Sequence, residues 1–97
     1  MRIIARSTLV AFWTRHPHST QALKAWFKVV KHANWKSPND VKTFYRAADV
    51  LKNGGVVFDI SGNKYRIVAW INYEYRILYI RFVGTHAEYD KIDATTI

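Results

Sequence analysis

Cysteine is absent from this sequence of 97 residues, which excludes a disulfide framework and any thiolate metal site. Acidic residues are scarce: 7 aspartates and glutamates stand against 15 lysines and arginines, which gives a formal net charge of +8. A chain this basic is expected to have a polyanionic partner, either nucleic acid, an acidic protein or a membrane surface. Long hydrophobic runs are missing too, and no stretch approaches the length of a membrane span.

The length of the chain predicts a single domain over residues 1–97, and 49% hydrophobic residues are enough for a core. We expect helices within about residues 5–46, a meander over about 55–83 and a terminal helix over about 86–92. The basic and apolar start of the chain lacks a small-residue cleavage site, so we do not interpret it as a signal peptide. Without cysteine, an intracellular, cytoplasmic location fits.

The first half of the chain predicts a pair of antiparallel helices. The first covers about residues 5–15 and stops before Pro17, and residues 1–4 are a candidate edge strand ahead of it. The second covers about residues 20–33, where large apolar residues recur at three- and four-residue spacing with lysines between them. Those apolar residues are Leu23, Trp26, Phe27 and Val30.

A cap, a proline and an acid within residues 37–40 predict a third, shorter helix from Pro38 to about Arg46. Residues 47–53 favour no regular element. The Gly54-Gly55 pair then breaks the chain ahead of the next segment.

The second half of the chain predicts a three-stranded antiparallel meander, because three runs rich in Val, Ile, Tyr and Phe are separated by turn signals. Side chains alternate between the two faces of a strand, and one set in each strand is almost entirely apolar. Stacking these sets gives one core face under the helices and leaves the other face open. The predicted core set is Val56, Phe58, Ile60, Tyr65, Ile67, Ala69, Ile71, Leu78, Ile80 and Phe82.

The opposite face of the meander carries the mid-strand charges. Gly62-Asn63 suits a two-residue hairpin loop, which sets Asp59 opposite Arg66. A two-residue loop at Tyr73-Glu74 would set Arg66 directly opposite Arg81. Like charges repel across a strand pair, so facing arginines indicate an anion between them. The expected open face carries Asp59, Lys64, Arg66 and Arg81.

The end of the sequence predicts a short capped helix. Gly84 is expected to end the sheet, and a capping box with Thr85 as N-cap predicts a helix over about 86–92. His86 and Tyr89 lie three residues apart and therefore share a face of that helix. This face is expected just beyond the end of the third strand.

Cutting RNA without a metal needs few groups. The 2′-hydroxyl must lose a proton and attack phosphorus, the 5′-oxygen must gain a proton as it leaves, and positive groups must stabilise charge on the phosphoryl oxygens. Arginine suits the last task through its planar fork, and Lys, His and Tyr can transfer protons. The catalytic candidates are Lys64, Arg66, Arg81, His86 and Tyr89.

RNA contacts are expected on the same face. Trp70 and Tyr79 lie there, Asn63 sits at the hairpin turn, and the carboxylate of Asp59 is placed to orient the nearer arginine. An aromatic side chain can stack on a base. For Trp70, as for Trp35, packing is the favoured interpretation.

Structural interpretations stay open for every catalytic candidate. The arginines could be surface residues paired with acids, Lys64 a solvated turn residue, His86 a solvated first-turn residue and Tyr89 a core residue. The other three histidines have no partners at metal-ligand spacing, so we predict neither a metal nor a cofactor.

Two motifs, GNKYRIVAWINY from residue 62 and YIRFVGTHAEYDKID from residue 79, resemble those of the HigB-type toxins of bacterial type II toxin–antitoxin pairs. The resemblance covers most of the chain and is strongest from Phe58 to Asp93. G-N-x-x-R followed by I-R-x-x-x-T-H-x-x-Y-D is the specific combination. The family's recurrent polar positions fall on Asn63, Arg66, Arg81, Thr85, His86, Tyr89 and Asp90.

The resemblance implies a small α+β fold related to the RelE toxins, with helices packed on one face of an antiparallel sheet. It also implies cleavage of mRNA, usually on translating ribosomes. The implied partner is a HigA-like helix-turn-helix antitoxin, and operator DNA would be contacted only through it. We therefore expect a metal-independent endoribonuclease in which Arg66 and Arg81 clamp the scissile phosphate. His86 is the first candidate for general base or acid, with Tyr89 or Lys64 as its counterpart.

Two other functions stay open. A basic module could hold RNA or the ribosome without chemistry, and it would then bind with a steep salt dependence and release no cleavage product. A degenerate toxin kept only for binding its partner protein would not arrest growth when expressed alone.

Overall fold

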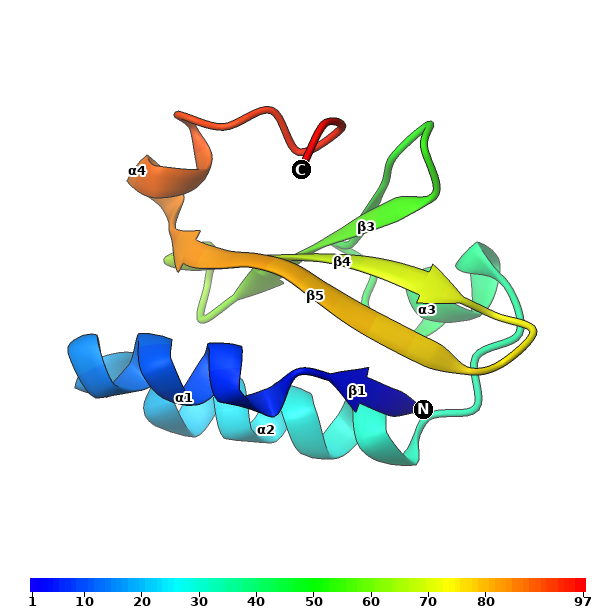
Figure 1. Cartoon of the computed structure of the whole chain (residues 1–97), viewed down its shortest axis with the longest axis horizontal. Helices are drawn as coiled ribbons and strands as arrows, with labels where there is room; N and C mark the ends of the chain where they lie inside the picture. The colour runs from blue at the N-terminus through cyan, green and yellow to red at the C-terminus, as the bar shows by residue number, and fades with distance from the viewer.

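The computed structural model describes residues 1–97 and has an α+β architecture, as expected. Its elements are β1 (Arg2–Ile4), α1 (Arg6–Arg15), a 3₁₀ turn (Pro17–Ser19), α2 (Thr20–His32), α3 (Pro38–Phe44), β2 (Asp49–Val50), β3 (Gly55–Ile60), β4 (Tyr65–Asn72), β5 (Ile77–Thr85) and α4 (His86–Tyr89). Figure 1 shows α1 and α2 side by side on one side of the sheet, and α4 with the C-terminal segment on the other. No helix has both the length and the apolar character that spanning a membrane requires.

The strands form one five-stranded sheet in the order β1-β5-β4-β3-β2. The candidate edge strand at the N-terminus is confirmed, and β1 runs parallel to β5 while the other pairs are antiparallel. The opposite edge is β2, which lies in the segment expected to be irregular. Two residues are too few for an alternating pattern to be recognised in a sequence.

The predicted helices are present and end within two residues of their expected limits, except α4. On α2 the buried residues are Leu23, Trp26 and Val30, in agreement with the apolar spacing. The hydroxyl of Ser37 accepts a hydrogen bond from the Asp40 backbone N–H, which confirms the predicted cap of α3. These helices hold together because each buries an apolar side against the same sheet face.

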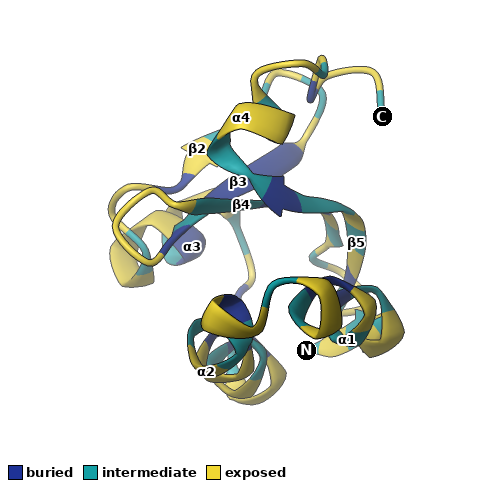
Figure 2. Cartoon of the chain, turned by 90° about the vertical axis from the view of Figure 1, so that its left-hand side faces the viewer, coloured by how far each residue is buried: buried dark blue, intermediate teal, exposed yellow.

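The core lies between the helices and that face, where Figure 2 shows the buried segments of both layers turned toward each other. Phe58 on β3 is fully buried among aromatic rings from the helical layer. Its ring centroid lies 5.3 Å from Trp26, 5.4 Å from Tyr45 and 6.2 Å from Trp35. The core face of β3 and β4 is therefore as predicted.

The first hairpin has the predicted register, with Asp59 paired to Arg66. Gly62 and Asn63 both have positive φ, and the Lys64 backbone N–H donates to the Ser61 carbonyl, as in a tight hairpin turn. The last pair is Ile60 with Tyr65, and Ser61 also has positive φ, so the loop contains residues 61–64 and the predicted two-residue loop is wrong. Its even length keeps the predicted register.

The second hairpin differs from the prediction. Asn72 pairs with Ile77, so the loop contains residues 73–76 rather than two residues. Neither residue of the Tyr73-Glu74 pair favours positive φ, and the chain reverses instead through Arg76, whose φ is 56°. The register between β4 and β5 is shifted as a result.

A β-bulge then interrupts β5. Val68 pairs with Phe82 but Ala69 pairs with Ile80, so Arg81 is left between them without a partner. Arg66 therefore lies opposite Gly84, and the predicted Arg66–Arg81 pair is wrong. The sheet also continues to Thr85 instead of ending at Gly84.

The bulge exchanges the two faces of β5 beyond Arg81, because one additional residue reverses the alternation. Phe82, predicted in the main core, packs instead against Val57 and Val68 on the opposite face. Val83 turns inward and packs against the main core. The sequence pattern predicts an uninterrupted strand, so it assigns both residues to the wrong face.

The face expected to be open is partly covered. The terminal helix ends at Tyr89 rather than Ile92, and the chain after it crosses the sheet. Ala94 is buried there with Val57 and Val68. The side-chain amide of Asn53 donates to the Thr95 carbonyl at 2.8 Å and fastens the segment to the β2–β3 loop. Solvent-exposed sheet remains only on either side of this segment.

Candidate active site

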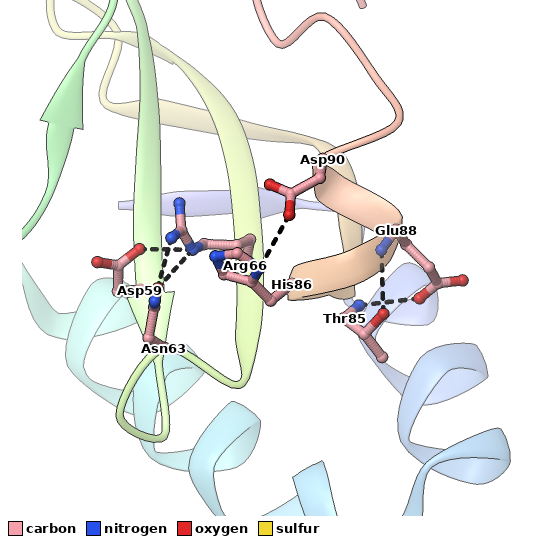
Figure 3. Close-up of polar contacts among 7 residues, drawn as sticks. All are labelled: Asp59, Asn63, Arg66, Thr85, His86, Glu88 and Asp90. Carbon is pink, nitrogen blue, oxygen red and sulfur yellow. Dashed lines mark hydrogen bonds and ion pairs between the residues drawn. The ribbon is translucent and has the colours of Figure 1, made fainter.

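Arg66 on β4 is held from one side by two neighbours in the first hairpin. Its Nε lies 2.8 Å from Oδ1 of Asp59 and donates to Oδ1 of Asn63 at 2.9 Å. Figure 3 shows both acceptors on the same side of the guanidinium. The Arg66 side chain is only 17% exposed. Asp59 therefore orients Arg66, as the hairpin register predicts.

Tyr89 of α4 supports the same guanidinium from another direction. The Arg66 Cζ atom lies 4.9 Å from the centre of the Tyr89 ring, which is cation–π distance. Tyr89 also packs against the cluster of Val57, Val68 and Ala94, and its ring centroid lies 6.4 Å from that of Phe82. Tyr89 is thus partly buried, but against the site rather than in the main core.

His86 begins α4 next to the first hairpin. Its backbone N–H donates to the Lys64 carbonyl at 3.0 Å, two residues before Arg66. The imidazole is half-exposed, and its Nδ1 lies 3.1 Å from Oδ2 of Asp90. Figure 3 shows Arg66 and His86 between Asp59 and Asp90. Because Asp90 occupies Nδ1, Nε2 is the nitrogen left to exchange a proton with a substrate.

The predicted capping box fixes where α4 starts. The Thr85 backbone N–H donates to Glu88 Oε1 at 2.8 Å, and the Glu88 N–H donates to the Thr85 hydroxyl at 3.2 Å. The first of these bonds is the main reason that the pKa of Glu88 is lowered. The cap sets His86 in the first turn and Tyr89 one turn later, so both lie beside the start of β4.

The remaining candidates lie elsewhere on this side of the sheet. Lys64 is exposed in the hairpin turn, and it contacts α4 through its backbone. Arg81 is exposed and lies over the Trp70 ring, with 5.9 Å from its Cζ to the ring centre. Trp70 is paired with Tyr79 and is 40% exposed, so packing does not account for it, whereas Trp35 is buried.

Asp90 is a site residue that reasoning from chemistry did not single out. The signal for it is the i,i+4 spacing from His86, which places a carboxylate and an imidazole on one side of a helix. No group of three His, Asp or Glu side chains is placed to hold a metal ion. The site consists of a supported guanidinium, an imidazole and a phenol.

Gly84 gives the site room, and replacing it is expected to disturb the site. A Cβ at this position would lie 2.5 Å from Phe82 Cζ and 3.2 Å from the Glu88 Cβ. We expect Gly84→Ala to lower the free energy of unfolding by about 1–3 kcal/mol, because Phe82 must leave its place against Tyr89. Urea denaturation measures this loss.

Removing the ring provides the control for that prediction. Phe82→Leu should make room for the alanine. The free energy of unfolding of the double variant should therefore fall by less than the sum of the losses in the two single variants. A Gly84→Ala protein as stable as the unaltered one would show that the ring is not confined there.

The chain matches a known protein family over most of its length. The protein-family model described as "HigB_toxin, RelE-like toxic component of a toxin-antitoxin system" matches residues 19–92, most of the chain. The chain belongs to the HigB toxin family. Its helices and mixed sheet are consistent with the RelE-like fold of that family.

Curated relatives of this HigB-family chain agree over nearly the full length. The "mRNA interferase HigB" of Escherichia coli O6:H1 is 29% identical over 95% of this chain and 91% of its own. The "mRNA interferase toxin HigB" of Escherichia coli K12 is 30% identical over 97% of this chain and 92% of its own. The same values hold for the "mRNA interferase HigB" of Shigella flexneri.

Proposed function

We propose that this HigB-family protein is a metal-independent endoribonuclease that cleaves mRNA as the toxin of a type II toxin–antitoxin pair. Relatives named mRNA interferases support the activity. The observation that carries the assignment is that the ring of Tyr89 lies against Arg66 and that His86 begins α4 beside the first hairpin, at the start of β4. These three side chains supply the positive group and the proton-transferring groups that cleavage through the 2′-hydroxyl requires.

The scissile phosphate binds at Arg66. The bonds to Asp59 and Asn63 use its Nε and one terminal nitrogen, so Nη1 and its two N–H groups stay available for phosphoryl oxygens. Because the guanidinium is anchored before substrate arrives, little reorganisation is needed as charge develops in the transition state. Asp59 and Asn63 act here as positioning residues.

Proton transfer belongs to His86 and a counterpart. Asp90 holds Nδ1, and Nε2 takes the proton of the 2′-hydroxyl or supplies one to the 5′-oxygen. Tyr89, with its ring against Arg66, and Lys64, at the hairpin turn, are the counterparts. The 2′-oxygen then bonds to phosphorus while the 5′-oxygen leaves, which yields a 2′,3′-cyclic phosphate and a free 5′-hydroxyl.

Arg81 has a different role from the one expected. It does not face Arg66 across the strands, so the two do not form a clamp on one phosphate. Its exposed guanidinium lies over Trp70, on the other side of the C-terminal segment from Arg66, and there it attracts the RNA backbone.

Membership of the family supports a proposal for the partners. The substrate is mRNA, cleaved on the ribosome, and the neutralising partner is a HigA-like helix-turn-helix antitoxin that alone contacts operator DNA. The protein acts in the cytoplasm, where ribosomes translate. The formal net charge of +8 supports binding to ribosomes and mRNA, because both are polyanions.

Removing the imidazole tests the assignment. His86→Ala is expected to lower the rate of mRNA cleavage about 10²-fold, because one of two assisted proton transfers is lost. Primer extension on mRNA, with ribosomes present, measures the rate.

His32→Ala is the matched control, because His32 is an exposed histidine on α2, in the helical layer beyond the sheet. It should cleave at the unaltered rate. Cleavage by folded His86→Ala protein at the unaltered rate would reject the role of His86. RNA binding with a steep salt dependence but no product from the unaltered protein would instead indicate a binding module.

A further inference from the structure

A row of exposed apolar side chains crosses the sheet at some distance from Arg66. Trp70 on β4 pairs with Tyr79 on β5, and Tyr79 pairs with Ile4 on β1. Paired residues point to the same face, so the three side chains lie next to one another on the side opposite α1 and α2. Trp70 is 40% exposed and the other two are 36% exposed. These three residues, called the aromatic row, are among the few large apolar side chains open to solvent.

Positive charge borders the aromatic row on two sides. The Arg81 guanidinium lies over the Trp70 ring, and its side chain makes no hydrogen bond or ion pair. Arg2 is exposed, pairs with Ile77, and therefore points to the same face of the sheet as the row. Neither the row nor the neighbouring row of Arg2, Ile77 and Asn72 contains an acidic residue. Aromatic faces beside unpaired guanidinium groups are the combination by which proteins hold single-stranded nucleic acid.

The aromatic row is separate from the proposed cleavage site. Trp70 lies four residues beyond Arg66 along β4, roughly 13 Å at the usual rise per residue of a strand. Between them Val68 is buried under Phe82 and Ala94 of the C-terminal segment. Figure 1 shows this segment above the middle of the sheet, leaving α4 at one end and the arrowhead of β4 at the other. A ligand on the row therefore does not occupy the site around Arg66 and His86.

We propose that Trp70, Tyr79 and Arg81 form a base-stacking subsite that binds an unpaired nucleobase of single-stranded RNA. This inference rests on the proposed function for its choice of RNA as ligand. The base stacks on the exposed face of Trp70 or Tyr79, and Arg81 contacts the adjoining phosphate. The base belongs to a nucleotide that flanks the scissile phosphate, because the row and Arg66 are too far apart to serve one nucleotide. The subsite would fix the position of the strand during cleavage.

A binding measurement without cleavage tests this subsite. The probe is a fluorescent 2′-O-methyl hexa-adenylate, in which the 2′-oxygen cannot attack, and the reference is an abasic ribose-phosphate chain of equal length. We expect Trp70→Ala to weaken binding of the hexa-adenylate about 5- to 150-fold, as for the loss of one stacked base. Binding of the abasic chain should change less than about twofold, and Trp70→Phe should keep most of the affinity.

Tyr75→Ala is the matched control, because Tyr75 is an exposed tyrosine in the β4–β5 loop outside the row. It should leave both affinities unchanged. The subsite is rejected if Trp70→Ala weakens binding of neither probe, weakens binding of both probes equally, or weakens only binding of the antitoxin. It is also rejected if the unaltered protein does not bind the hexa-adenylate. Base-dependent binding through Trp70 in a protein that cleaves no mRNA would support the subsite and reject the proposed function.

Discussion

Arg66→Ala is expected to lower the rate of mRNA cleavage about 10³-fold, because the pre-positioned donor that stabilises the phosphoryl oxygens is removed. Arg66→Lys should recover little of this loss. A lysine keeps the charge but has no planar fork, so it cannot hold Asp59 and Asn63 on one side and a phosphate on the other. Primer extension with ribosomes present measures the rate, and growth arrest on expression reports the toxicity.

Arg46→Ala is the control for this experiment, because Arg46 is an exposed arginine after α3 with no side-chain ion pair. Its cleavage rate should match that of the unaltered protein. Circular dichroism must show that the Arg66 variants fold, since Asp59 loses its partner in them. Undiminished cleavage by folded Arg66→Ala protein would remove Arg66 from the mechanism.

Phe58→Ala is expected to lower the free energy of unfolding by about 3–5 kcal/mol, the usual range for deleting a buried phenylalanine ring. The ring joins β3 to rings from three places in the helical layer, on Trp26, Trp35 and Tyr45. The cavity left by its removal cannot be filled without moving all of them. A loss of this size is a large part of the stability of a domain this small.

Phe44→Ala provides the comparison, because Phe44 is 61% exposed although its ring also approaches Trp35 and Tyr45. Phe44→Ala should lower the free energy of unfolding by less than about 1 kcal/mol, as for surface substitutions. Urea denaturation followed by the fluorescence of the buried tryptophans measures both variants. Equal losses in the two proteins would show that Phe58 is not the centre of the core.

The two hairpins show why one register was predictable and the other was not. In the first, Gly62-Asn63 supplies two residues that adopt positive φ readily, so the position of the turn and the Asp59–Arg66 register follow from local conformational preference, although the loop is longer than predicted. In the second, no such pair exists. The bulge at Arg81 turns Phe82 to the outer face, where it packs beside Gly84 and against Tyr89 of another element.

The residues of the candidate site can likewise be separated into those placed by local contacts and those placed by long-range contacts. The first hairpin places Arg66 beside Asp59, and the capping box places His86 and Tyr89 on α4, and both follow from a few neighbouring residues. The β4–β5 register, in which Tyr65 pairs with Thr85, then brings α4 to Arg66, and that register was not predicted. Arg81 was predicted opposite Arg66. It lies over the Trp70 ring instead, because the register between β4 and β5 differs from the prediction and the bulge leaves Arg81 unpaired.

The amino-acid sequence by itself determined the helices apart from the end of α4, the caps of α3 and α4, the apolar face of β3 and β4, and the register of the first hairpin. Each depends on interactions between residues a few positions apart. Only the tertiary structure decided that the N-terminal edge strand pairs parallel to β5, where the bulge lies, and that the C-terminal segment divides the outer face in two. These features depend on contacts between residues far apart in the chain, and their free energy is set by packing that no short stretch of sequence contains.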